Sequence, residues 1–460
     1  MLGKTRHIHF VGIGGIGMSG IAEILLNLGF TVSGSDVEKS SLTQRLAARG
    51  ATVRIGHAAK NVAGSDVVVV SSAIGSGNPE VVAARERGIP IIPRTYMLGE
   101  LMRIRTGIAI AGAHGKTTTT SLVAAVLQEA GLDPTIVVGG RVKSLKANVR
   151  LGQGEFLVAE ADESDGNFVH LAPVFAIITN IDAEHLDFYG HLEAIHDAFV
   201  EFSRRVPFYG AIICCVDDPQ VRTILPRIDR RLWTYGFSPD ADVRGTIIEA
   251  SAGGTRFTYT AKGKRRGRLY LRTPGVHNVL NALGVCTLAE ELDIEQRHLR
   301  NAFAAFEGVA RRFEIKGERN GILFIDDYGH HPTEIAATIR TARENYERRL
   351  IVVFQPHRYT RTRDLHDKFG VCFREADELF IADIYPAGER SIPGVTADLI
   401  YRAVMHEGKP RVSYVPGWND LKQAVRETIR PGDIVITLGA GNIYQLGEEL
   451  LGEKGPVKKR

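Results

Sequence analysis

The sequence predicts an α/β fold of three domains, each built around a β-sheet, and three observations support this prediction. Short apolar segments alternate with helical stretches along most of the chain, as in doubly wound parallel sheets. Glycine-rich turns directly follow two of these segments, at 12–17 and 112–115. With 460 residues the chain has room for roughly three domains of about 150 residues each. We expect the domain boundaries at 104/105 and 310/311.

Composition and charge exclude several classes of protein. Charged residues make up 24% of the chain and apolar residues 44%, proportions typical of a globular protein. A net charge of +4 is small for this length and argues against a dedicated nucleic-acid binder. No apolar run reaches the roughly 18 residues of a membrane span, and no signal-type segment precedes the first glycine turn. The four cysteines lack C-x-x-C spacing, so we expect a protein of the reducing cytoplasm without nucleic-acid or membrane partners.

The first domain begins with a strand at His7–Val11 that enters a G-x-G-x-x-G turn at 12–17. A helix at Ser19–Leu28 and a second strand at Phe30–Ser35 follow, and the strand leads into Asp36. An acidic residue about 20 positions after such a turn is typical of dinucleotide-binding sheets. Alone, the turn favours a nicotinamide or flavin site, and the alternative is a turn that only packs helix against strand. Further strands expected at 67–72 and 89–92 complete a Rossmann-like sheet, with the loop 71–74 at its ligand-binding edge.

The second domain begins with an apolar strand at Ile108–Ala111, a glycine turn at 112–115, and then Lys116 and Thr117. Backbone N–H groups of such a turn and the following helix N-terminus can bind a phosphate. Lys116 would reach the outer phosphates, and the Thr117 hydroxyl would bind a magnesium ion. The G-x-x-G-K-T pattern is shorter than the standard phosphate-loop motif, but it predicts a sheet of the P-loop ATPase type.

Acidic residues follow the next apolar strand of this domain, within Glu155–Asp165. Close carboxylates repel one another unless a cation is present, so a magnesium site is one explanation and a solvated acidic loop is the other. A further strand at Val174–Thr179 leads into Asn180–Asp187. Because parallel strands end at one edge of a sheet, Lys116, Glu160 and His185 are expected to converge on one nucleotide.

Near the end of the second domain the sequence pattern changes from continuous apolar runs to alternating apolar and polar residues. Alternating segments within 243–271, separated by glycine turns, predict a small antiparallel subsheet. The basic run at 262–268 is expected to be a solvated hairpin tip, because no aromatic residues interleave it. A helix then opens within 275–282 and places Asn278 and Asn281 on one face. Their amides could read the edge of a base or cap the helix.

The third domain is expected from residue 311, with a first strand at Ile322–Ile325 and further strands at 350–354, 378–384 and 433–438. These segments predict a second Rossmann-like, doubly wound sheet. The strand ends are rich in polar residues, and the usual companions of a zinc site are missing beside His330 and His331. Three arginines beside His357 instead suggest a pocket for anionic groups: Arg358, Arg361 and Arg363.

Two glycine-turn sheets on either side of an ATP-type domain argue against a simple dehydrogenase. A motor or helicase would use the phosphate loop but should carry a more basic surface. A non-enzymatic nucleotide sensor remains possible from the phosphate loop alone. It does not explain why acids, histidines and arginines gather at strand ends in two domains.

The order of these motifs resembles the Mur ligase family over essentially the whole chain. Six stretches carry the resemblance: His9–Gly20, Gly115–Thr117, Glu160–Asp165, His277–Asn278, Asp326–Glu334 and Gln355–Arg361. The resemblance implies an ATP-dependent ligase of peptidoglycan precursor synthesis that joins L-alanine to the lactyl carboxylate of UDP-N-acetylmuramic acid. ATP would first convert the carboxylate to an acyl phosphate, and the alanine amine would then displace phosphate. Closure of the third domain onto the second would exclude water from that intermediate.

The same resemblance implies roles for individual residues. The catalytic residues would be Lys116, His330, Arg358 and Arg361. The ATP site would comprise Gly112, Ala113, His114, Gly115, Lys116, Thr117, Thr118, His277, Asn278, Asn281 and Asp327. The UDP-sugar site would comprise Gly14, Gly15, Ile16, Met18, Ser19, Asp36, Ser72, Ala73, Arg94 and Asn180. The amino-acid site would comprise Tyr328, His357, Arg358 and Arg361, and the Mg²⁺ ligands would be Thr117, Glu160 and His185.

Two departures from the family pattern are visible. Ala113 stands where relatives usually carry threonine, and no lysine occurs between Asn180 and Gly210, so we expect no carbamylated lysine. The alternatives are the cell-wall recycling ligase, which attaches a tripeptide, and an ATP-dependent binding or regulatory protein without turnover. By the resemblance, the residues at Tyr328–Gly329 and His357–Arg358 favour the alanine reaction. We expect a monomer or weak homodimer.

Overall fold

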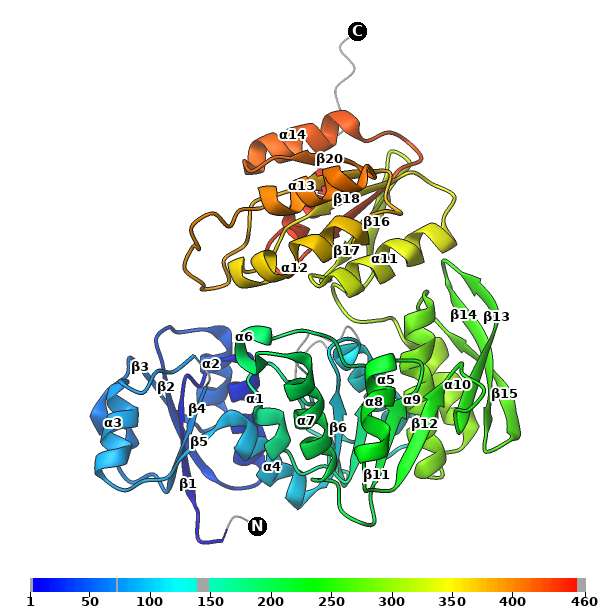
Figure 1. The fold of residues 1–460 in the computed structure, drawn as a ribbon. Coiled ribbons are helices and arrows are strands. Elements are labelled where there is room, and N and C mark those ends of the chain that lie inside the picture. Colours follow the sequence, from blue (N-terminus) through cyan, green and yellow to red (C-terminus); the bar gives the residue numbers. More distant parts are fainter. Residues whose placement is uncertain (1–2, 72, 139–148, 453–460) are drawn as a thin grey trace. The chain divides into compact units, whose positions relative to one another are not determined.

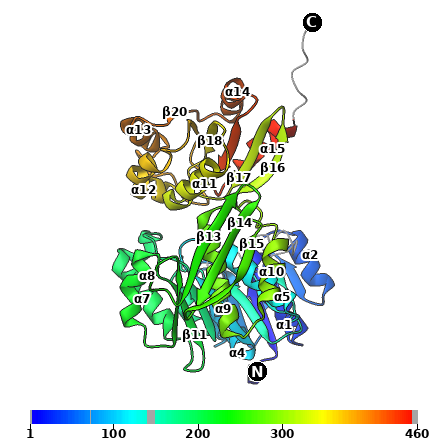
Figure 2. The same ribbon diagram turned by 90° about the vertical axis from the view of Figure 1, so that its right-hand side faces the viewer.

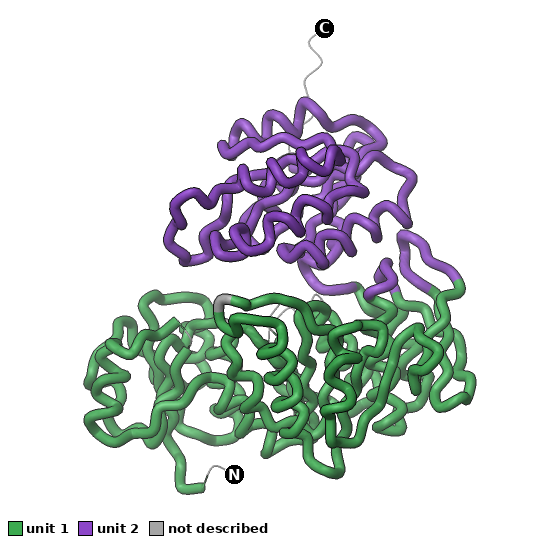
Figure 3. The backbone as a smooth tube through the Cα atoms, in the orientation of Figure 1, with its two compact units in different colours: residues 1–248, 256–271, 278–307 green, residues 249–255, 272–277, 308–460 purple. Residues whose placement is uncertain are grey.

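Three β-sheets follow one another along the chain in the computed structural model (Figure 1). The structure describes residues 3–71, 73–138 and 149–452. The chain forms two units, coloured in Figure 3. Unit 1 comprises 1–248, 256–271 and 278–307, and unit 2 comprises 249–255, 272–277 and 308–460. The predicted α/β fold with three sheets is confirmed.

The first sheet has five parallel strands in the order β3-β2-β1-β4-β5. Helix α1 begins within the glycine turn, at Ile16, earlier than the expected Ser19, and β3 is a strand that was not predicted from the sequence. The strands are β1 (His7–Val11), β2 (Thr31–Asp36), β3 (Thr52–Ile55), β4 (Val67–Val70) and β5 (Ile91–Pro93). The helices are α1 (Ile16–Asn27), α2 (Ser41–Ala48), η1 (Ala59–Val62), α3 (Pro79–Glu86) and α4 (Arg94–Ile104).

The second sheet has ten strands in the order β15-β14-β13-β12-β11-β10-β6-β9-β7-β8. Strand β6 is central and lies between β9 and β10, parallel to both. The strands are β6 (Thr106–Ala111), β7 (Thr135–Val137), β8 (Val149–Arg150), β9 (Phe156–Glu160), β10 (Phe175–Ile178), β11 (Ala211–Cys215), β12 (Leu232–Gly236), β13 (Val243–Ser251), β14 (Gly254–Ala261) and β15 (Lys264–Leu271).

Figure 2 shows β13, β14 and β15 side by side as three long strands. Their two-residue connections permit only antiparallel pairing, as the alternating sequence predicts. The helices of this part are α5 (Lys116–Glu129), η2 (Asn167–His170), α6 (Leu186–Tyr189), α7 (Leu192–Ser203), α8 (Pro219–Ile224), η3 (Leu225–Arg227), α9 (Val276–Glu291) and α10 (Gln296–Ala305).

The first two sheets share one apolar core within unit 1. One cluster of buried side chains joins Met18 and Leu98 to Ala109 and Phe168. Gly20 of α1 lies so close to Val149 that an added Cβ would collide with it. The phosphate loop and the N-terminal glycine turn are therefore built on one continuous body.

The third sheet belongs to unit 2 and has the order β16-β17-β21-β18-β19-β20. Strand β16 pairs antiparallel with β17, and the other neighbours are parallel. The strands are β16 (Glu314–Arg319), β17 (Ile322–Asp327), β18 (Leu350–Phe354), β19 (Glu378–Ile381), β20 (Arg411–Tyr414) and β21 (Ile434–Leu438). The helices are α11 (Pro332–Asn345), α12 (Tyr359–Cys372), α13 (Asp398–Glu407), α14 (Trp418–Thr428) and α15 (Tyr444–Gly452).

Two further features bear on the class of protein. The four cysteines are free thiols and all are buried. Among the described residues, no helix combines the length and the apolar character that a bilayer span requires.

Candidate active site

The phosphate loop connects the buried strand β6 to helix α5. Gly112 has a φ of +132° and Gly115 a φ of +82°, values that favour glycine. A Cβ on Gly112 would lie 2.9 Å from the carbonyl oxygen of Asn180, and one on Gly115 would lie 2.6 Å from Oδ1 of Asn281. The loop therefore requires glycine at both positions. The first N–H groups of α5 have no partner within the helix and can face an anion.

Residues after β10 hold this loop in place. The Asn180 side chain accepts a hydrogen bond from the His114 N–H at 2.7 Å and donates one to the His114 carbonyl at 2.9 Å. Thr179 Oγ1 donates to the same carbonyl at 2.7 Å. Nε2 of His114 lies 3.0 Å from Oδ2 of Asp182. Asn180, which we expected at the UDP-sugar, thus braces the phosphate loop in this structure.

Lys116 is the first residue of α5, and its ammonium group turns back toward the loop. Its Nζ donates to the carbonyls of Gly112 at 2.6 Å and Ala113 at 3.2 Å. It also lies 3.0 and 2.9 Å from the two carboxylate oxygens of Glu163. Burial acts to lower the pKa of Lys116, but the charges of Glu163 and Asp162 outweigh burial and raise it above its ordinary value. The lysine is therefore a charged group with a bidentate carboxylate partner.

Glu163, the carboxylate of this ion pair, also lies close to a second carboxylate and a histidine. Glu163, Glu184 and His185 each offer one ligand atom, and these atoms lie within 4.8 Å of one another. His185 precedes α6 and has a φ of +56°. Of the expected metal ligands, His185 belongs to this group and Glu160 does not. Thr117 lies in the first turn of α5 and Glu160 at the end of β9. Both acid-rich runs are visible in the sequence, but spacing along the chain does not show which carboxylates point toward each other.

The N-terminal glycine turn brings several expected UDP-sugar residues together. The Gly14 N–H donates to Oδ2 of Asp36 at 2.8 Å. Gly15 is the N-cap of α1, and Ile16 is the first residue of the helix. The guanidinium of Arg94 packs so closely on Gly17 that a Cβ there would collide with it. A positive charge therefore lies at the start of α1, as a phosphate site requires.

Apart from Asn180, the other described residues expected at the UDP-sugar lie within α1 or in the loop after β4. Met18 and Ser19 are buried within α1, at 2% and 6% exposure. Ala73 is exposed in the loop after β4, and Ser72 lies outside the described residues.

In unit 2, the ends of β17 and β18 carry a cluster of rings. The His330 ring lies 5.5 Å from that of Tyr328 and 5.7 Å from that of His357, measured between centroids. His357 in turn stacks on Tyr385 at 5.7 Å with an interplanar angle of 7°. Burial, reinforced by the charges of His330 and Arg361, lowers the pKa of His357 to about 3. His357 is therefore neutral at physiological pH.

The arginines of this cluster lie at the start of α12. Nη1 of Arg361 donates to the His357 carbonyl at 3.2 Å. Arg358 has a φ of +72°, and its N–H donates to the Tyr385 carbonyl at 2.9 Å. The Nε of Arg358 is buried and has no hydrogen-bond partner among the described residues. A buried donor without an acceptor is costly, so this guanidinium is suited to an anionic ligand.

Asp327 has its carboxylate turned toward the backbone. It accepts hydrogen bonds from the N–H groups of Phe313 at 2.6 Å and Gly329 at 2.7 Å. Burial raises the pKa of Asp327 to about 6. In this structure Asp327, expected in the ATP site, shapes the loop that carries Tyr328.

Arg311 and Arg312 stand at the expected start of the third domain and were given no functional role from the sequence. The structure places both guanidiniums over the Tyr328 ring, at 5.1 and 5.3 Å from its centroid. Arg312 also pairs with Glu334 at 3.0 Å. In the sequence, the one hint that these arginines contact Tyr328 is that two adjacent arginines precede a strand with a polar end.

His277, Asn278 and Asn281, all expected in the ATP site, divide between the two units. His277 belongs to unit 2, where burial lowers its pKa to about 4. Asn278 and Asn281 belong to unit 1 and are buried in α9, at 8% and 7% exposure. Asn281 contacts the phosphate loop at Gly115.

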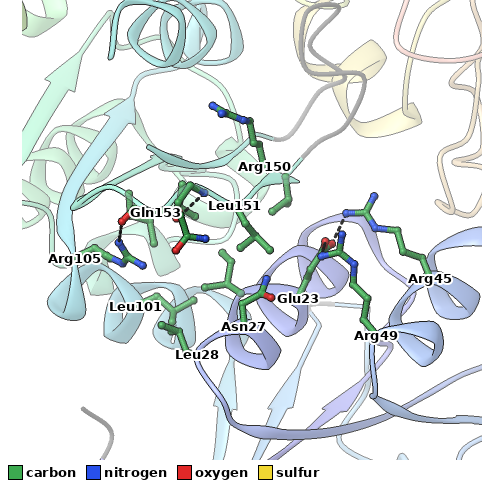
Figure 4. Close-up of a pocket in the computed structure, with 15 residues that line it drawn as sticks. Glu23, Asn27, Leu28, Arg45, Arg49, Leu101, Arg105, Arg150, Leu151 and Gln153 are labelled. Carbon is green, nitrogen blue, oxygen red and sulfur yellow. Dashed lines mark hydrogen bonds and ion pairs between the residues drawn. The ribbon is translucent and has the colours of Figure 1, made fainter. Parts of the chain in front are cut away.

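A cavity of about 460 Å³ lies elsewhere in unit 1, among α1, α2, α4 and the segment 149–157 (Figure 4). Four arginines line it: Arg45, Arg49, Arg105 and Arg150. Arg45 and Arg49 both pair with the buried Glu23, as Figure 4 shows. Arg105 donates to the Gly154 carbonyl, and Arg150 pairs with Asp133. Arg49 and Arg105 also follow the last residues of α2 and α4, where cations stabilise helix ends. These arginines already have structural partners.

Family models match three consecutive parts of the chain. Residues 7–106 match the Mur ligase family catalytic domain, residues 110–289 the Mur ligase middle domain, and residues 311–441 the Mur ligase glutamate ligase domain.

Similar proteins extend over the full length. The chain is 55% identical over 452 residues to UDP-N-acetylmuramate--L-alanine ligase of Geobacter sp. (strain M21), covering 98% of each chain. It is 54% identical over 453 residues to the enzyme of that name from Geobacter sulfurreducens, again covering 98% of each. The crystal structure of UDP-N-acetylmuramate-alanine ligase from Thermotoga maritima matches with a TM-score of 0.77 and 32% identity, over 97% of this chain and 98% of that one. A murein peptide ligase from Psychrobacter arcticus matches with a TM-score of 0.69 and 25% identity, over 97% and 98%.

Proposed function

The chain belongs to the Mur ligase family, and on that premise we propose that it is an ATP-dependent UDP-N-acetylmuramate:L-alanine ligase. The observation that carries this proposal is the similarity at 55% identity across 98% of the chain to a ligase of that name. The phosphate loop with Lys116 supports the ATP-dependent step. The arginines beside His357 support recognition of an amino-acid carboxylate.

A carboxylate is a poor acyl donor, so the reaction needs an activated intermediate. A lactyl carboxylate oxygen attacks the γ-phosphorus of ATP, and ADP leaves. The alanine amine then attacks the acyl carbon, loses a proton and displaces inorganic phosphate. Lys116 offsets the charge that spreads over the transferred phosphoryl group.

We propose that Mg²⁺ binds beside the phosphate loop. Two carboxylates and an imidazole within 4.8 Å are a suitable donor set for a divalent cation. By family resemblance Thr117, Glu160 and His185 are the ligands, and Glu163 and Glu184 stand next to His185. The bound ion would supply positive charge to the phosphates of ATP.

The remaining substrate sites follow the division of the chain. We propose that 1–104 bind the UDP-sugar, with Asp36 and Arg94 at the glycine turn, that 105–310 bind ATP, and that 311–460 bind alanine. The unpartnered Nε of Arg358 supports its role as a ligand for the alanine carboxylate. Closure of the domains during turnover stays a prediction.

The compartment and assembly are proposals as well. Four buried free thiols fit a reducing compartment, and ATP is a cytoplasmic substrate. We therefore propose a cytoplasmic enzyme that acts as a monomer or weak homodimer.

Phosphate release by the purified protein tests the proposal. The protein would be supplied with ATP, Mg²⁺ and UDP-N-acetylmuramic acid, together with either L-alanine or the cell-wall tripeptide. We expect phosphate release and a product heavier by one alanyl residue with L-alanine only. Release with tripeptide alone would identify a recycling ligase, and release with neither would indicate a binding protein.

A further inference from the structure

The ammonium group of Lys116 is fully occupied in this structure. It has three protons, and four acceptors surround Nζ within 3.2 Å: the carbonyls of Gly112 and Ala113 and both carboxylate oxygens of Glu163. No proton is left over for a further strong acceptor. A nucleotide phosphate can therefore bind Lys116 only if one of these acceptors gives way.

Glu163 is the acceptor that resembles a phosphate most closely. It is anionic, and it presents two oxygens to the ammonium at 2.9 and 3.0 Å. The two carbonyls belong to the loop itself, so releasing them would deform the phosphate cradle. The carboxylate belongs to the segment after β9 and can leave without disturbing that cradle.

Two hydrogen bonds to its carbonyl oxygen hold the backbone of Glu163 in place, whereas its side chain is held by Lys116. Its carbonyl accepts hydrogen bonds from the Tyr189 hydroxyl at 2.7 Å and from the Gly166 N–H at 3.0 Å. Its side chain is only 4% exposed. A buried carboxylate left beside the phosphates without a cation would repel them, because charges interact strongly where water is excluded.

We infer that Glu163 is a positioning residue that occupies Lys116 in place of the nucleotide phosphates and releases it when nucleotide binds. The inference rests on the proposed binding of ATP at this loop. Glu163 keeps the lysine charged and aimed at the phosphate site in the empty enzyme. The exchange has a cost, since binding of nucleotide must break a buried ion pair.

The test is the affinity for ADP in EDTA, measured by calorimetry, so that no divalent cation contributes. Glu163→Gln keeps the shape of the side chain but removes its charge, and we expect ADP to bind five- to tenfold more tightly than to the wild type. Asp165→Asn is the matched control, because it removes the same charge from the same segment without contacting Lys116. We expect the control to change the dissociation constant less than twofold.

Two further variants keep the result decisive. Glu163→Asp retains the charge but shortens the reach to Nζ, and we expect a two- to threefold gain in ADP affinity even if Glu163→Gln does not fold. In a Lys116→Met background, Glu163→Gln can only relieve repulsion and no longer frees a lysine, so its gain in ADP affinity should be smaller than in the wild-type background. A purely structural role would instead weaken ADP binding in the Glu163 variants, so unchanged or weaker binding would overturn the inference. Failure of the wild type to bind ADP at all would count against the proposed function itself.

Discussion

At the scale of single residues, Lys116 has the most direct role in the proposed chemistry. The structure places its ammonium inside the phosphate loop, where a charged acceptor raises its pKa. Removing one electrostatic contact to a transferred phosphoryl group slows such reactions by orders of magnitude.

Lys116→Ala should reduce acyl-phosphate formation by about 10³-fold or more. UDP-sugar binding should remain, because the glycine turn and Arg94 belong to the first domain, and Lys116 does not. Single-turnover phosphate release measures the first effect, and titration with UDP-N-acetylmuramic acid measures the second. Loss of UDP-sugar binding in a folded variant would contradict this division of labour.

Glycine is required at Gly115 because of both its backbone conformation and its neighbour. Gly115→Ala would place a methyl group 2.6 Å from Oδ1 of Asn281 at a φ of +82°. We expect ATP affinity to fall at least tenfold as the loop shifts. Gly77→Ala is the control, because nothing lies within 4 Å of an added Cβ there. Equal affinities in equilibrium nucleotide titrations of the two variants would show that the loop tolerates the methyl group.

At the scale of elements, a buried polar network ties α3 to the first sheet. Glu80 is inaccessible to solvent and accepts hydrogen bonds from Ser35 at 2.6 Å and Asn61 at 2.5 Å. It also accepts from the Ala58 N–H at 3.1 Å and lies 3.1 Å from Nε2 of His9. Burial acts to raise the pKa of Glu80, but these hydrogen bonds outweigh it and lower the pKa to about 2.

This lowered pKa predicts a specific pH dependence of stability. An unfolded glutamate titrates near 4.5, so the ionised form stabilises the fold at higher pH, and this contribution is lost as the pH falls from 4.5 toward 2. Glu80→Gln should cost about 2 to 3 kcal/mol at pH 7. Urea unfolding measures the free energy of unfolding of wild type and variant at pH 7, 5 and 3. The difference between the two proteins should be about equal at pH 7 and pH 5 and smaller at pH 3. A difference that grows at pH 3 would refute the assignment.

Elements also show how far the sequence determined the fold. The strands that carry the site, such as β6, β10 and β18, were predicted because buried parallel strands are continuous apolar runs. Edge strands such as β3 and β16 were missed, since they are shorter or more polar and their pairing is decided by neighbours distant in sequence. Helix α1 begins earlier than expected because the last two residues of the glycine turn already belong to the helix.

At the scale of the whole molecule, motif order predicted three sheets and the family, whereas partner choice within the site required the structure. The sequence placed Lys116, Glu160 and His185 at one sheet edge, but it could not show that Glu163 binds the lysine. Asn180 illustrates the same limit, because its side chain could serve either the UDP-sugar or the phosphate loop. Such choices depend on side-chain directions that spacing along the chain does not encode.

In the proposed reaction the lactyl carboxylate is activated as an acyl phosphate before alanine attacks it. The most direct measurement uses UDP-N-acetylmuramic acid labelled with ¹⁸O in the lactyl carboxylate, with ATP, Mg²⁺ and L-alanine. Because the displaced phosphate keeps the bridging oxygen, the mechanism predicts one ¹⁸O atom in each phosphate released by a fully labelled substrate, detected by mass spectrometry. Released phosphate without ¹⁸O would show that no acyl phosphate forms, and absence of release with L-alanine would show that the protein does not catalyse this reaction.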